Sequence, residues 1–234
     1  MKKKTAAIVL AAGQGSRMKS DVHKQYLLLK GRPVLYYSLK AFEDSFVDEI
    51  VLVTGAGEIS YCRKEIVEKY GLRKVSRIVE GGRERYHSVF CGLQALDGCG
   101  YVFIHDGARP FITGEILERA YEAVQKENAC VVGMPVKDTI KLVDEDGYAD
   151  STPRRDRMWL IQTPQVFSFD LVRGAYASFL EKEEMFLEQG MKVTDDAMLV
   201  EQFTNTRIKL VEGSYENIKI TTPEDMIVAE AFLK

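Results

Sequence analysis

The sequence has few of the residues that build metal centres or disulfide frameworks. Its three histidines are scattered, and its four cysteines, Cys62, Cys91, Cys99 and Cys130, contain no C-x-x-C pair. This spacing excludes a zinc-finger type of site and gives no disulfide framework, so we expect reduced, partly buried thiols. Long apolar runs are also missing, since none approaches the ~18 residues that a bilayer-spanning helix needs.

An excess of either charge is lacking as well. The chain has 32 Lys and Arg residues against 35 Asp and Glu residues, a net charge of −3. A broad nucleic-acid-binding face needs clustered positive charge and is not expected, although a local basic cluster could bind a small anionic ligand. With 46% hydrophobic and 29% charged residues, the composition is that of a globular protein with one packed core. The length by itself allows one large domain or two small ones. We predict a single domain over residues 1–234, with residues 137–157 projecting from it.

The first residues could be mistaken for a signal peptide. A basic start, Met1–Lys4, precedes the apolar stretch Thr5–Ala12. That stretch runs directly into Gly13-Gln14-Gly15, however, which is typical of a turn after a buried strand. We therefore interpret it as the first strand and expect a cytoplasmic protein.

Short apolar runs alternate with helical patterns as far as Val136. Near-continuous β-branched or aromatic runs are typical of strands buried on both faces of a parallel sheet. They predict strands at Ala6–Leu10, Glu49–Thr54, Ser76–Glu80, Tyr101–Asp106 and Ala129–Val136. Helices are predicted at Pro33–Glu43, Glu58–Tyr70, Glu84–Leu96 and Glu115–Glu127, the last with Thr113 as N-cap. The alternation predicts right-handed crossovers and a doubly wound, mostly parallel, Rossmann-like α/β sheet.

The alternation breaks at Lys137–Arg157. Thr139–Val143 alternates like an exposed strand, and Asp144–Gly147 is a turn signal, so a polar hairpin that projects from the sheet is predicted. A hairpin of this kind is poorly stable alone and is expected to dock elsewhere. The remaining predicted elements are helices at Ser168–Glu184 and Asp195–Phe203, a strand at Ile208–Val211, and a helix that starts at Thr222-Pro223.

Glycines and cations follow the first predicted strand. In open α/β sheets, ligands bind beyond the carboxyl ends of the strands, where Ala11-Ala12-Gly13-Gln14-Gly15-Ser16-Arg17 is found. Lys24 follows before the next helix, and an arginine and a lysine beside a glycine turn suit a polyphosphate. The run is not a Walker A loop, because the G-x-x-x-x-G-K-[ST] pattern is absent. It is not a dinucleotide fingerprint either, because Met18 stands where the third glycine would be. A simple tight turn with solvated cations is the alternative.

Two other strand ends carry candidate ligands. Gly81-Gly82 ends the third strand, with Ser88 on the helix after it, and would allow the backbone to contact a flat ligand such as a base. Asp106 and Arg109 end the fourth strand. Asp106 is a hard oxygen ligand placed where a carboxylate meets Mg²⁺ bound to phosphates, with a turn cap as the alternative. Arg109 indicates either an anion site or a structural ion pair.

Several motifs in order make a resemblance specific. They are Leu10-Ala-Ala-Gly-x-Gly-x-Arg-Met18, Lys24-Gln-Tyr26, Gly81-Gly82-x-Glu-Arg85 with Ser88, His105-Asp106-x-Ala-Arg-Pro110, Val136-Lys-Asp-Thr139, Trp159-x-x-Gln-Thr163-Pro-Gln165, Thr194-Asp195 and Asn217-Ile-Lys-Ile-Thr-x-Pro-Glu-Asp225. Over nearly the whole chain they resemble the 2-C-methyl-D-erythritol 4-phosphate cytidylyltransferase family of the non-mevalonate isoprenoid pathway. The resemblance implies that the 4-phosphate of the polyol attacks the α-phosphorus of CTP and pyrophosphate leaves.

The resemblance also implies roles for individual residues. Arg17 and Lys24 would stabilise charge on the α-phosphate, and Arg155 and Lys219 would position the substrate, although Arg154 and Arg157 lie close enough to confuse the choice of Arg155. The implied CTP-binding residues are Ala11, Ala12, Gly13, Gly15, Gly82, Ser88 and Asp106, with Asp106 also the ligand of Mg²⁺. The implied polyol-phosphate residues are Arg109, Thr139, Thr163, Thr194 and Asp195. Backbone carbonyls near Gly81–Arg83 are our own candidates for reading the exocyclic amine of cytosine.

Residues 137–157 correspond to an arm that interlocks two subunits in this family. The resemblance therefore implies a homodimer in which arm residues such as Thr139 act in trans.

Two positions depart from the family pattern: His23 replaces a common proline, so that the Lys24 loop is expected to be less rigid, and Arg83 stands where an acidic residue is frequent. Ribitol-5-phosphate cytidylyltransferase is the nearest alternative, and a non-catalytic nucleotide-binding module is the alternative of another class.

Overall fold

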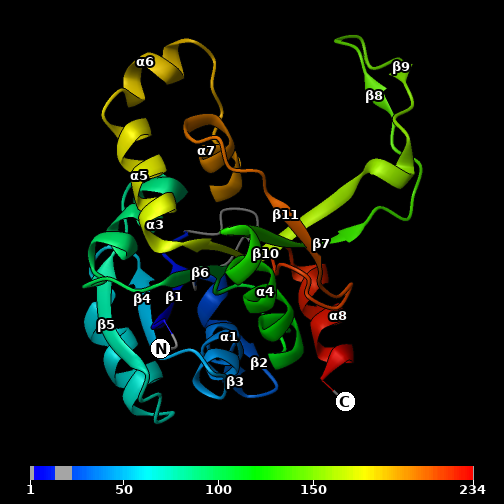
Figure 1. Ribbon diagram of the computed structural model, residues 1–234. Helices are drawn as coiled ribbons and strands as arrows, with labels where there is room; N and C mark the ends of the chain where they lie inside the picture. Colours follow the sequence, from blue (N-terminus) through cyan, green and yellow to red (C-terminus); the bar gives the residue numbers. More distant parts are fainter. Residues whose placement is uncertain (1–2, 14–22, 234) are drawn as a thin grey trace.

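A seven-stranded sheet forms the centre of the protein in a computed structural model that describes residues 3–13 and 23–233 (Figure 1). The strand order is β11-β7-β10-β6-β1-β4-β5. These strands are β1 (Thr5–Ala11), β4 (Glu49–Thr54), β5 (Val75–Glu80), β6 (Tyr101–Asp106), β7 (Ala129–Pro135), β10 (Trp159–Ser168) and β11 (Lys209–Glu212). All pairs are parallel except those of β10, which runs antiparallel between β6 and β7. The predicted class, a doubly wound and mostly parallel α/β sheet, is confirmed.

Strand β10 is absent from the strands that the sequence predicts. Its middle is polar, with Gln162, Thr163 and Gln165, and it contains Pro164, a residue that central strands usually exclude. The pairing of β10 with β7 shifts register between Ile161 and Gln165, and this irregularity accommodates the proline. The apolar signal of a buried strand is lost because the polar residues of β10 face the candidate site, described below.

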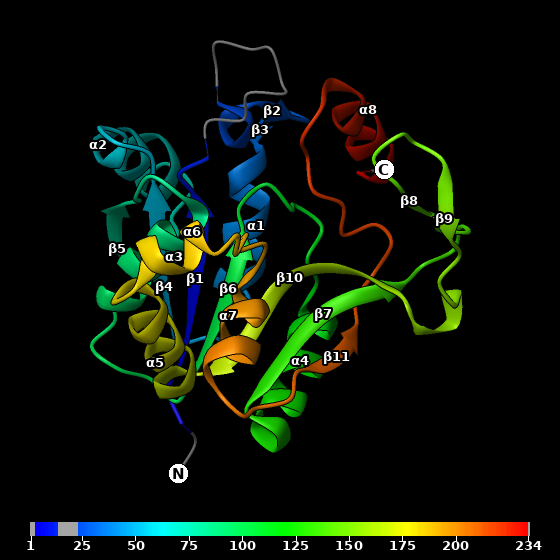
Figure 2. The same cartoon turned by 90° about the horizontal axis from the view of Figure 1, so that it is seen from above.

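Helices cover both faces of the sheet (Figure 2). Alternate residues of β1 belong to two different hydrophobic cores. Ala7 and Val9 belong to the core beneath α1 and α4, whereas Ala6 and Ile8 belong to the core beneath α3, α5 and α7. The helices are α1 (Val34–Glu43), α2 (Ile59–Tyr61) with its π-helical continuation Cys62–Glu68, α3 (Arg85–Gln94), α4 (Gly114–Glu127), α5 (Phe169–Leu180), α6 (Glu183–Glu188), α7 (Asp196–Phe203) and α8 (Pro223–Phe232). Strand β1 is thus buried on both faces, which confirms it as a strand of the fold.

Helix ends follow the predicted chemistry. The Thr113 side chain accepts a hydrogen bond from the backbone N–H of Ile116 at the start of α4. Thr222 and Asp225 form a capping box at the start of α8, with Pro223 in the first turn. The single helix expected at Ser168–Glu184 is two helices, α5 and α6. None of the helices in the described residues has the length and apolarity to span a membrane.

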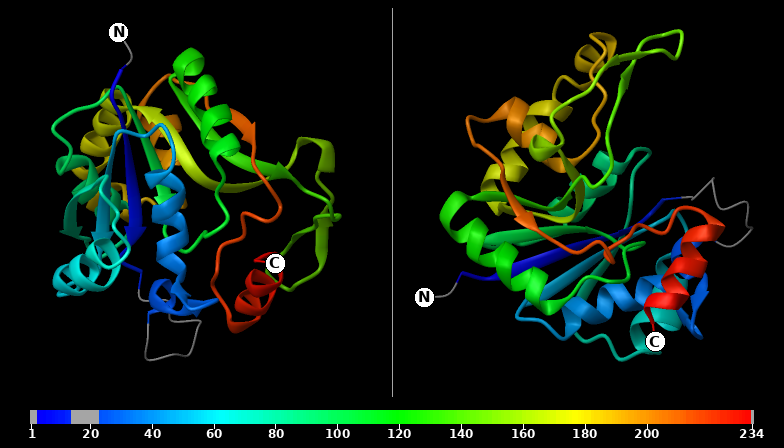
Figure 3. Two further views of the ribbon diagram at one scale, coloured as in Figure 1. Left: turned by 90° about the horizontal axis from the view of Figure 1, so that it is seen from below. Right: turned by 90° about the vertical axis from the view of Figure 1, so that its right-hand side faces the viewer.

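The predicted hairpin is present and extends away from the sheet (Figures 1 and 3). Its strands β8 (Leu142–Val143) and β9 (Ala149–Ser151) pair only with each other, and every residue in both is exposed. The paired part is shorter than the expected Thr139–Val143. A 3₁₀ turn, η4 (Arg155–Arg157), leads back into β10. We call residues 137–157 the arm.

Candidate active site

The turn after β1 forms one wall of a cavity at the carboxyl ends of the strands. Ala11, Ala12 and Gly13 line it, and Lys24 reaches it from η2 (Lys24–Tyr26). The amide of Gln25 donates to the backbone carbonyl of Ala11 at 2.6 Å and attaches this segment to the end of β1. The predicted residues Gly15 and Arg17 lie outside the described part of the chain.

The turn after β5 forms the opposite wall. Gly82 and Ser88 line the cavity, and the backbone N–H of Gly82 donates to the Ser88 hydroxyl at 3.2 Å. A Cβ on Gly81 would lie 2.7 Å from the Cβ of Ala12, so the close approach of the two walls requires glycine there. Arg83, the departure from the family pattern, also lines this cavity. The structure therefore brings the predicted nucleotide residues from both turns to one place.

Asp106, at the end of β6, lies among three cations. Its Oδ2 is 2.7 Å from Nζ of Lys219, and its Oδ1 is 3.3 Å from Nε of Arg85. Burial by itself would raise the pKa of Asp106, but the charges of Arg85, Lys219 and Arg109 outweigh burial and hold the pKa well below its usual range. Asp106 is therefore an ionised carboxylate on the cavity wall.

The backbone under Asp106 is fixed by a buried relay. The N–H of Asp106 donates to the hydroxyl oxygen of Thr163 at 3.1 Å, and this hydroxyl lies 3.1 Å from Nδ1 of His105. Nε2 of His105 lies 3.1 Å from the carbonyl oxygen of Arg109, which can only accept, so Nε2 carries the proton and Nδ1 accepts from Thr163. Burial lowers the pKa of His105 to about 4, which keeps the ring neutral, as this relay requires.

A second cavity adjoins the first and shares Arg85, Asp106 and Lys219 with it. Its other lining residues come from β10, the turn after β6 and the start of α7. They include four of the five predicted polyol-phosphate residues: Arg109, Thr163, Thr194 and Asp195. The predicted two halves of the site are thus adjacent cavities that meet at Asp106 and Lys219.

The loop that carries Lys219 is held from beneath by Asn217. This fully buried side chain donates to the side-chain oxygen of Gln162 at 3.2 Å and to the carbonyl of Thr163 at 2.9 Å. Arg109 in turn donates to the backbone carbonyl of Asn217 at 2.8 Å. Lys219 therefore stands on a loop tied to β10, a strand that the sequence does not predict.

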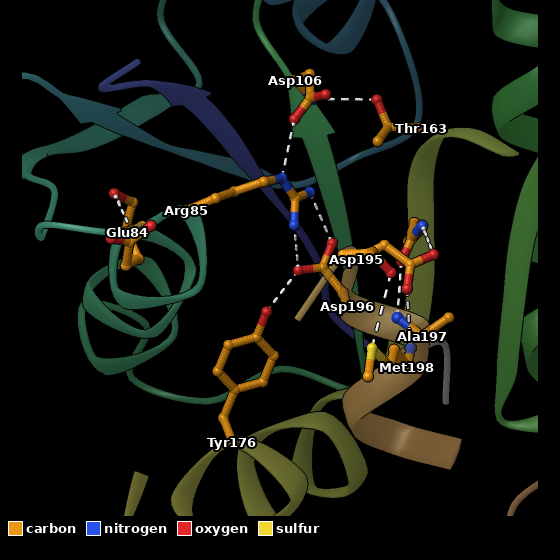
Figure 4. A network of polar contacts seen from close by, with 12 residues as sticks. Glu84, Arg85, Asp106, Thr163, Tyr176, Asp195, Asp196, Ala197 and Met198 are labelled. Carbon is orange, nitrogen blue, oxygen red and sulfur yellow. Dashed lines mark hydrogen bonds and ion pairs between the residues drawn. The ribbon is translucent and has the colours of Figure 1, made fainter. Parts of the chain in front are cut away.

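Arg85 and Asp196 are site residues for which the sequence suggests no role (Figure 4). The guanidinium of Arg85 makes two bonds to the carboxylate of Asp196, at 2.7 and 2.8 Å, while its Nε faces Asp106. Asp196 is fully buried and also accepts from the hydroxyl of Tyr176. This bidentate pair joins α3, on the nucleotide side, to α7, on the polyol side. Two features of the sequence could have drawn attention to these residues. Arg85 belongs to the Gly81–Arg85 motif, and Asp196 follows the predicted site residue Asp195 directly.

Thr139 and Arg155 lie apart from both cavities. They are exposed residues of the arm, and Arg155 donates to the backbone carbonyl of Lys137 at 2.8 Å within it. Of the four predicted catalytic cations, Lys24 and Lys219 line one cavity, Arg155 does not, and Arg17 is not described. In the described part of one chain, the sheet and its loops line the two cavities and no residue of the arm does.

The two cavities together can bind a polyanion. Lys24, Arg83, Arg85 and Lys219 line the first with backbone from two glycine turns. Among the described residues that line it, these cations outnumber the one carboxylate, Asp106. Such an arrangement favours phosphate groups over neutral ligands. Among the described residues no three histidine, cysteine or acidic side chains gather in a way that could hold a metal by themselves.

Comparison with known proteins relates the chain to one family. The sequence model of one family, described as IspD: 2-C-methyl-D-erythritol 4-phosphate cytidylyltransferase, matches residues 5–234. Relatives with that name from Lachnospira eligens and Lachnoclostridium phytofermentans are 54% identical over 229 residues and 52% identical over 231, and each match covers at least 97% of both chains. The crystal structure of 4-diphosphocytidyl-2C-methyl-D-erythritol synthase from Anaerococcus prevotii is similar with a TM-score of 0.85 at 39% identity, covering 99% of this chain and 96% of that one.

Proposed function

This chain belongs to the 2-C-methyl-D-erythritol 4-phosphate cytidylyltransferase family, and from that premise we propose how its residues perform the reaction. The enzyme transfers CMP from CTP to 2-C-methyl-D-erythritol 4-phosphate, releases pyrophosphate and so serves isoprenoid biosynthesis. Ribitol 5-phosphate is not favoured as the acceptor, and a non-catalytic module is excluded by membership of an enzyme family.

The observation that carries the proposal is the junction of the two cavities at Asp106 and Lys219. CTP occupies the first cavity, with its base at Gly82 and Ser88 and its phosphates at the turn Ala11–Gly13. The polyol phosphate occupies the second, against Arg109, Thr163, Thr194 and Asp195. This places the attacking phosphate and the α-phosphate of CTP at the shared wall.

The chemical difficulty is that both reactants are anions. Phosphoryl and nucleotidyl transfer need little proton chemistry, so catalysis depends on positioning and on cations that meet the developing charge. Lys24 and Arg17 stabilise the charge on the α-phosphate. Lys219 and Arg155 hold the attacking phosphate in line with it.

The site also fits a Mg²⁺ ion that arrives with the nucleotide. Mg²⁺ keeps several waters and needs only one or two carboxylates beside substrate phosphates, and Asp106 is one ionised carboxylate on the wall of the nucleotide cavity. We assign Asp106 as its protein ligand. When bound, the ion would neutralise part of the triphosphate charge.

Arg155 and Thr139 reach an active site in this proposal only through dimerisation. Every residue of β8 and β9 is exposed, including the apolar side chains of Leu142 and Val143, which are 51% and 63% exposed. Two short exposed strands are not stable alone, so they need a partner. We propose a homodimer in which each arm supplies these residues to the other subunit.

Free thiols in all four cysteines and a nucleoside triphosphate substrate support a cytoplasmic location.

Pyrophosphate release measured with purified protein, CTP and Mg²⁺ tests the assignment. We expect turnover with 2-C-methyl-D-erythritol 4-phosphate that greatly exceeds turnover with ribitol 5-phosphate, and little with UTP in place of CTP. Turnover with ribitol 5-phosphate alone would overturn the choice of acceptor. Turnover with neither acceptor would overturn the proposed activity.

A further inference from the structure

One carboxylate holds both sides of the segment that carries Lys24. Nδ1 of His23 lies 2.7 Å from Oε1 of Glu58, and the hydroxyl of Tyr26 donates to Oε2 of Glu58 at 2.7 Å. His23 and Tyr26 flank Lys24 in the chain, and their rings stack with centroids 6.3 Å apart. Glu58 itself comes from the turn after β4, at the edge of the sheet where the site lies.

Glu58 is fixed in turn by its surroundings. The backbone N–H of Gly55 donates to Oε2 at 3.0 Å, and a Cβ on Gly55 would lie only 2.7 Å from that oxygen. Glycine at position 55 therefore lets the carboxylate approach the backbone. Burial raises the pKa of Tyr26 well above its usual value, so its hydroxyl remains a donor to Glu58.

The Lys24 side chain, between His23 and Tyr26 in the chain, lines the nucleotide cavity. Gln25 is bonded to the end of β1 as described above. His23 and Tyr26 thus fix the backbone around Lys24 through Glu58, and Gln25, which itself lines the cavity, fixes it through Ala11. A lysine side chain has several rotatable bonds, so a fixed backbone reduces the volume that its ammonium can explore.

We propose that Glu58 is a positioning residue that sets the Lys24 ammonium against the transferring phosphate of CTP. The proposal rests on the role assigned to Lys24 above. It also gives His23 a function: the loop loses the proline common at this position, but the contact between His23 and Glu58 restrains it instead.

The chain contains a matched control for this cluster. Glu183 accepts from the Tyr86 hydroxyl at 2.6 Å and lies 3.0 Å from Nε2 of His87, so the same three residue types meet there, with Nε2 of His87 in place of Nδ1 of His23. The Glu183 side chain is 22% exposed and that of Glu58 is 17% exposed. Glu183 joins α6 to α3, a helix whose position is already set by Val89 and Leu93 in the core. Loss of Glu183 therefore removes equal chemistry without loosening the Lys24 segment.

The experiment compares Glu58→Ala, Glu183→Ala and Lys24→Ala with a Glu58→Ala/Lys24→Ala double variant, and measures kcat and KM for both substrates. Glu58→Ala is expected to lower kcat about tenfold or more, the scale of a small misplacement of a catalytic group, with KM for the polyol phosphate unchanged. Glu183→Ala should keep the wild-type kcat. In the Lys24→Ala background, removal of Glu58 should have no further effect, because the two residues act through one ammonium group.

Equal kcat values for Glu58→Ala and Glu183→Ala would overturn the proposal, as would an undiminished effect of Glu58→Ala in the Lys24→Ala background. A wild-type kcat for Lys24→Ala would instead overturn the role of Lys24 in the proposed function. If Glu58→Ala does not fold, Tyr26→Phe removes one anchor and keeps the ring. Tyr86→Phe is then its control, and only Tyr26→Phe should lower kcat.

Discussion

The sheet and the arm use the same kinds of residue in opposite surroundings. Arg85 and Asp196 form a bidentate pair in which the carboxylate is fully buried, whereas the Arg154–Asp156 pair on the arm, at 2.6 Å, has side chains that are 75% and 63% exposed. The buried pair fixes the wall between two cavities, and the exposed pair fixes nothing outside its own turn. Functional geometry within one chain therefore resides in the sheet, and in the dimer proposed above the arm would acquire it from a second chain.

The largest expected effect is a difference in protein stability between variants that break the buried ion pair and variants that break the exposed one. Asp196→Asn should lower the free energy of unfolding by about 3–5 kcal/mol, because Arg85 is left with a charge that its buried partner no longer compensates. Asp156→Asn should cause no measurable change, because water already solvates both side chains of that pair. Urea denaturation of the two variants measures the difference. Equal losses would contradict the contrast between sheet and arm.

The next effect concerns catalysis by the sheet. Lys219→Ala should lower kcat about a hundredfold, the scale of removing one preorganised charge from the transition state. Lys209→Ala is the control. Lys209 lies on the outer strand β11 of the sheet and lines neither cavity, so its replacement should leave kcat unchanged. Steady-state pyrophosphate release compares them, and a wild-type kcat for Lys219→Ala would remove this residue from the mechanism.

A catalytic effect of the arm should depend on the partner subunit. Arg155→Ala is expected to lower kcat by a similar factor, but mixed dimers of Arg155→Ala and Lys219→Ala chains should regain activity, since one site then has both cations. Random mixing of two chains in a two-fold dimer restores about a quarter of the wild-type activity. The measurement is turnover after the two inactive chains are unfolded and refolded together. No recovery would mean that Arg155 acts within its own chain or not at all.

The smallest expected effect is a pH dependence of the free energy of unfolding, caused by His105 in strand β6 of the sheet. His105 has a pKa of about 4 when folded because it is buried, and an ordinary value near 6.5 when unfolded. Between these values the unfolded chain binds a proton that the folded chain does not, so stability falls as pH decreases, by up to about 1.4 kcal/mol per pH unit. Denaturation at pH 7 and pH 5 measures the slope, which should be smaller in His105→Gln. The arm contains no histidine and adds nothing in this range.

Prediction from the sequence succeeded where the pattern is local and failed where polar residues are buried. The apolar runs of β1, β4 and β6 and the N-cap Thr113 are visible in the chain because burial and capping need particular neighbours. Strand β10 is not visible, since its middle is Gln162-Thr163-Pro164-Gln165. The three polar side chains are compatible with a central strand because partners such as His105, Asp195 and Asn217 bond to them in the folded protein.

The candidate site shows the same division. The glycine turns, Lys24, Asp106 and Lys219 could be selected from the sequence because each follows a predicted strand or belongs to a motif. The pairing of Arg85 with Asp196, and of Glu58 with His23 and Tyr26, could not, because contacts between residues so far apart leave no periodic trace.

The amino-acid sequence by itself determined the α/β class, the exposed hairpin and the residue types that meet phosphate, because periodicity, turn chemistry and charge act over short stretches of chain. Only the tertiary structure decided which of those residues share a cavity. An antiparallel strand inserted between β6 and β7 brings Thr163 beneath Asp106 and the Asn217 loop beside it, and that insertion depends on buried hydrogen bonds between segments more than fifty residues apart.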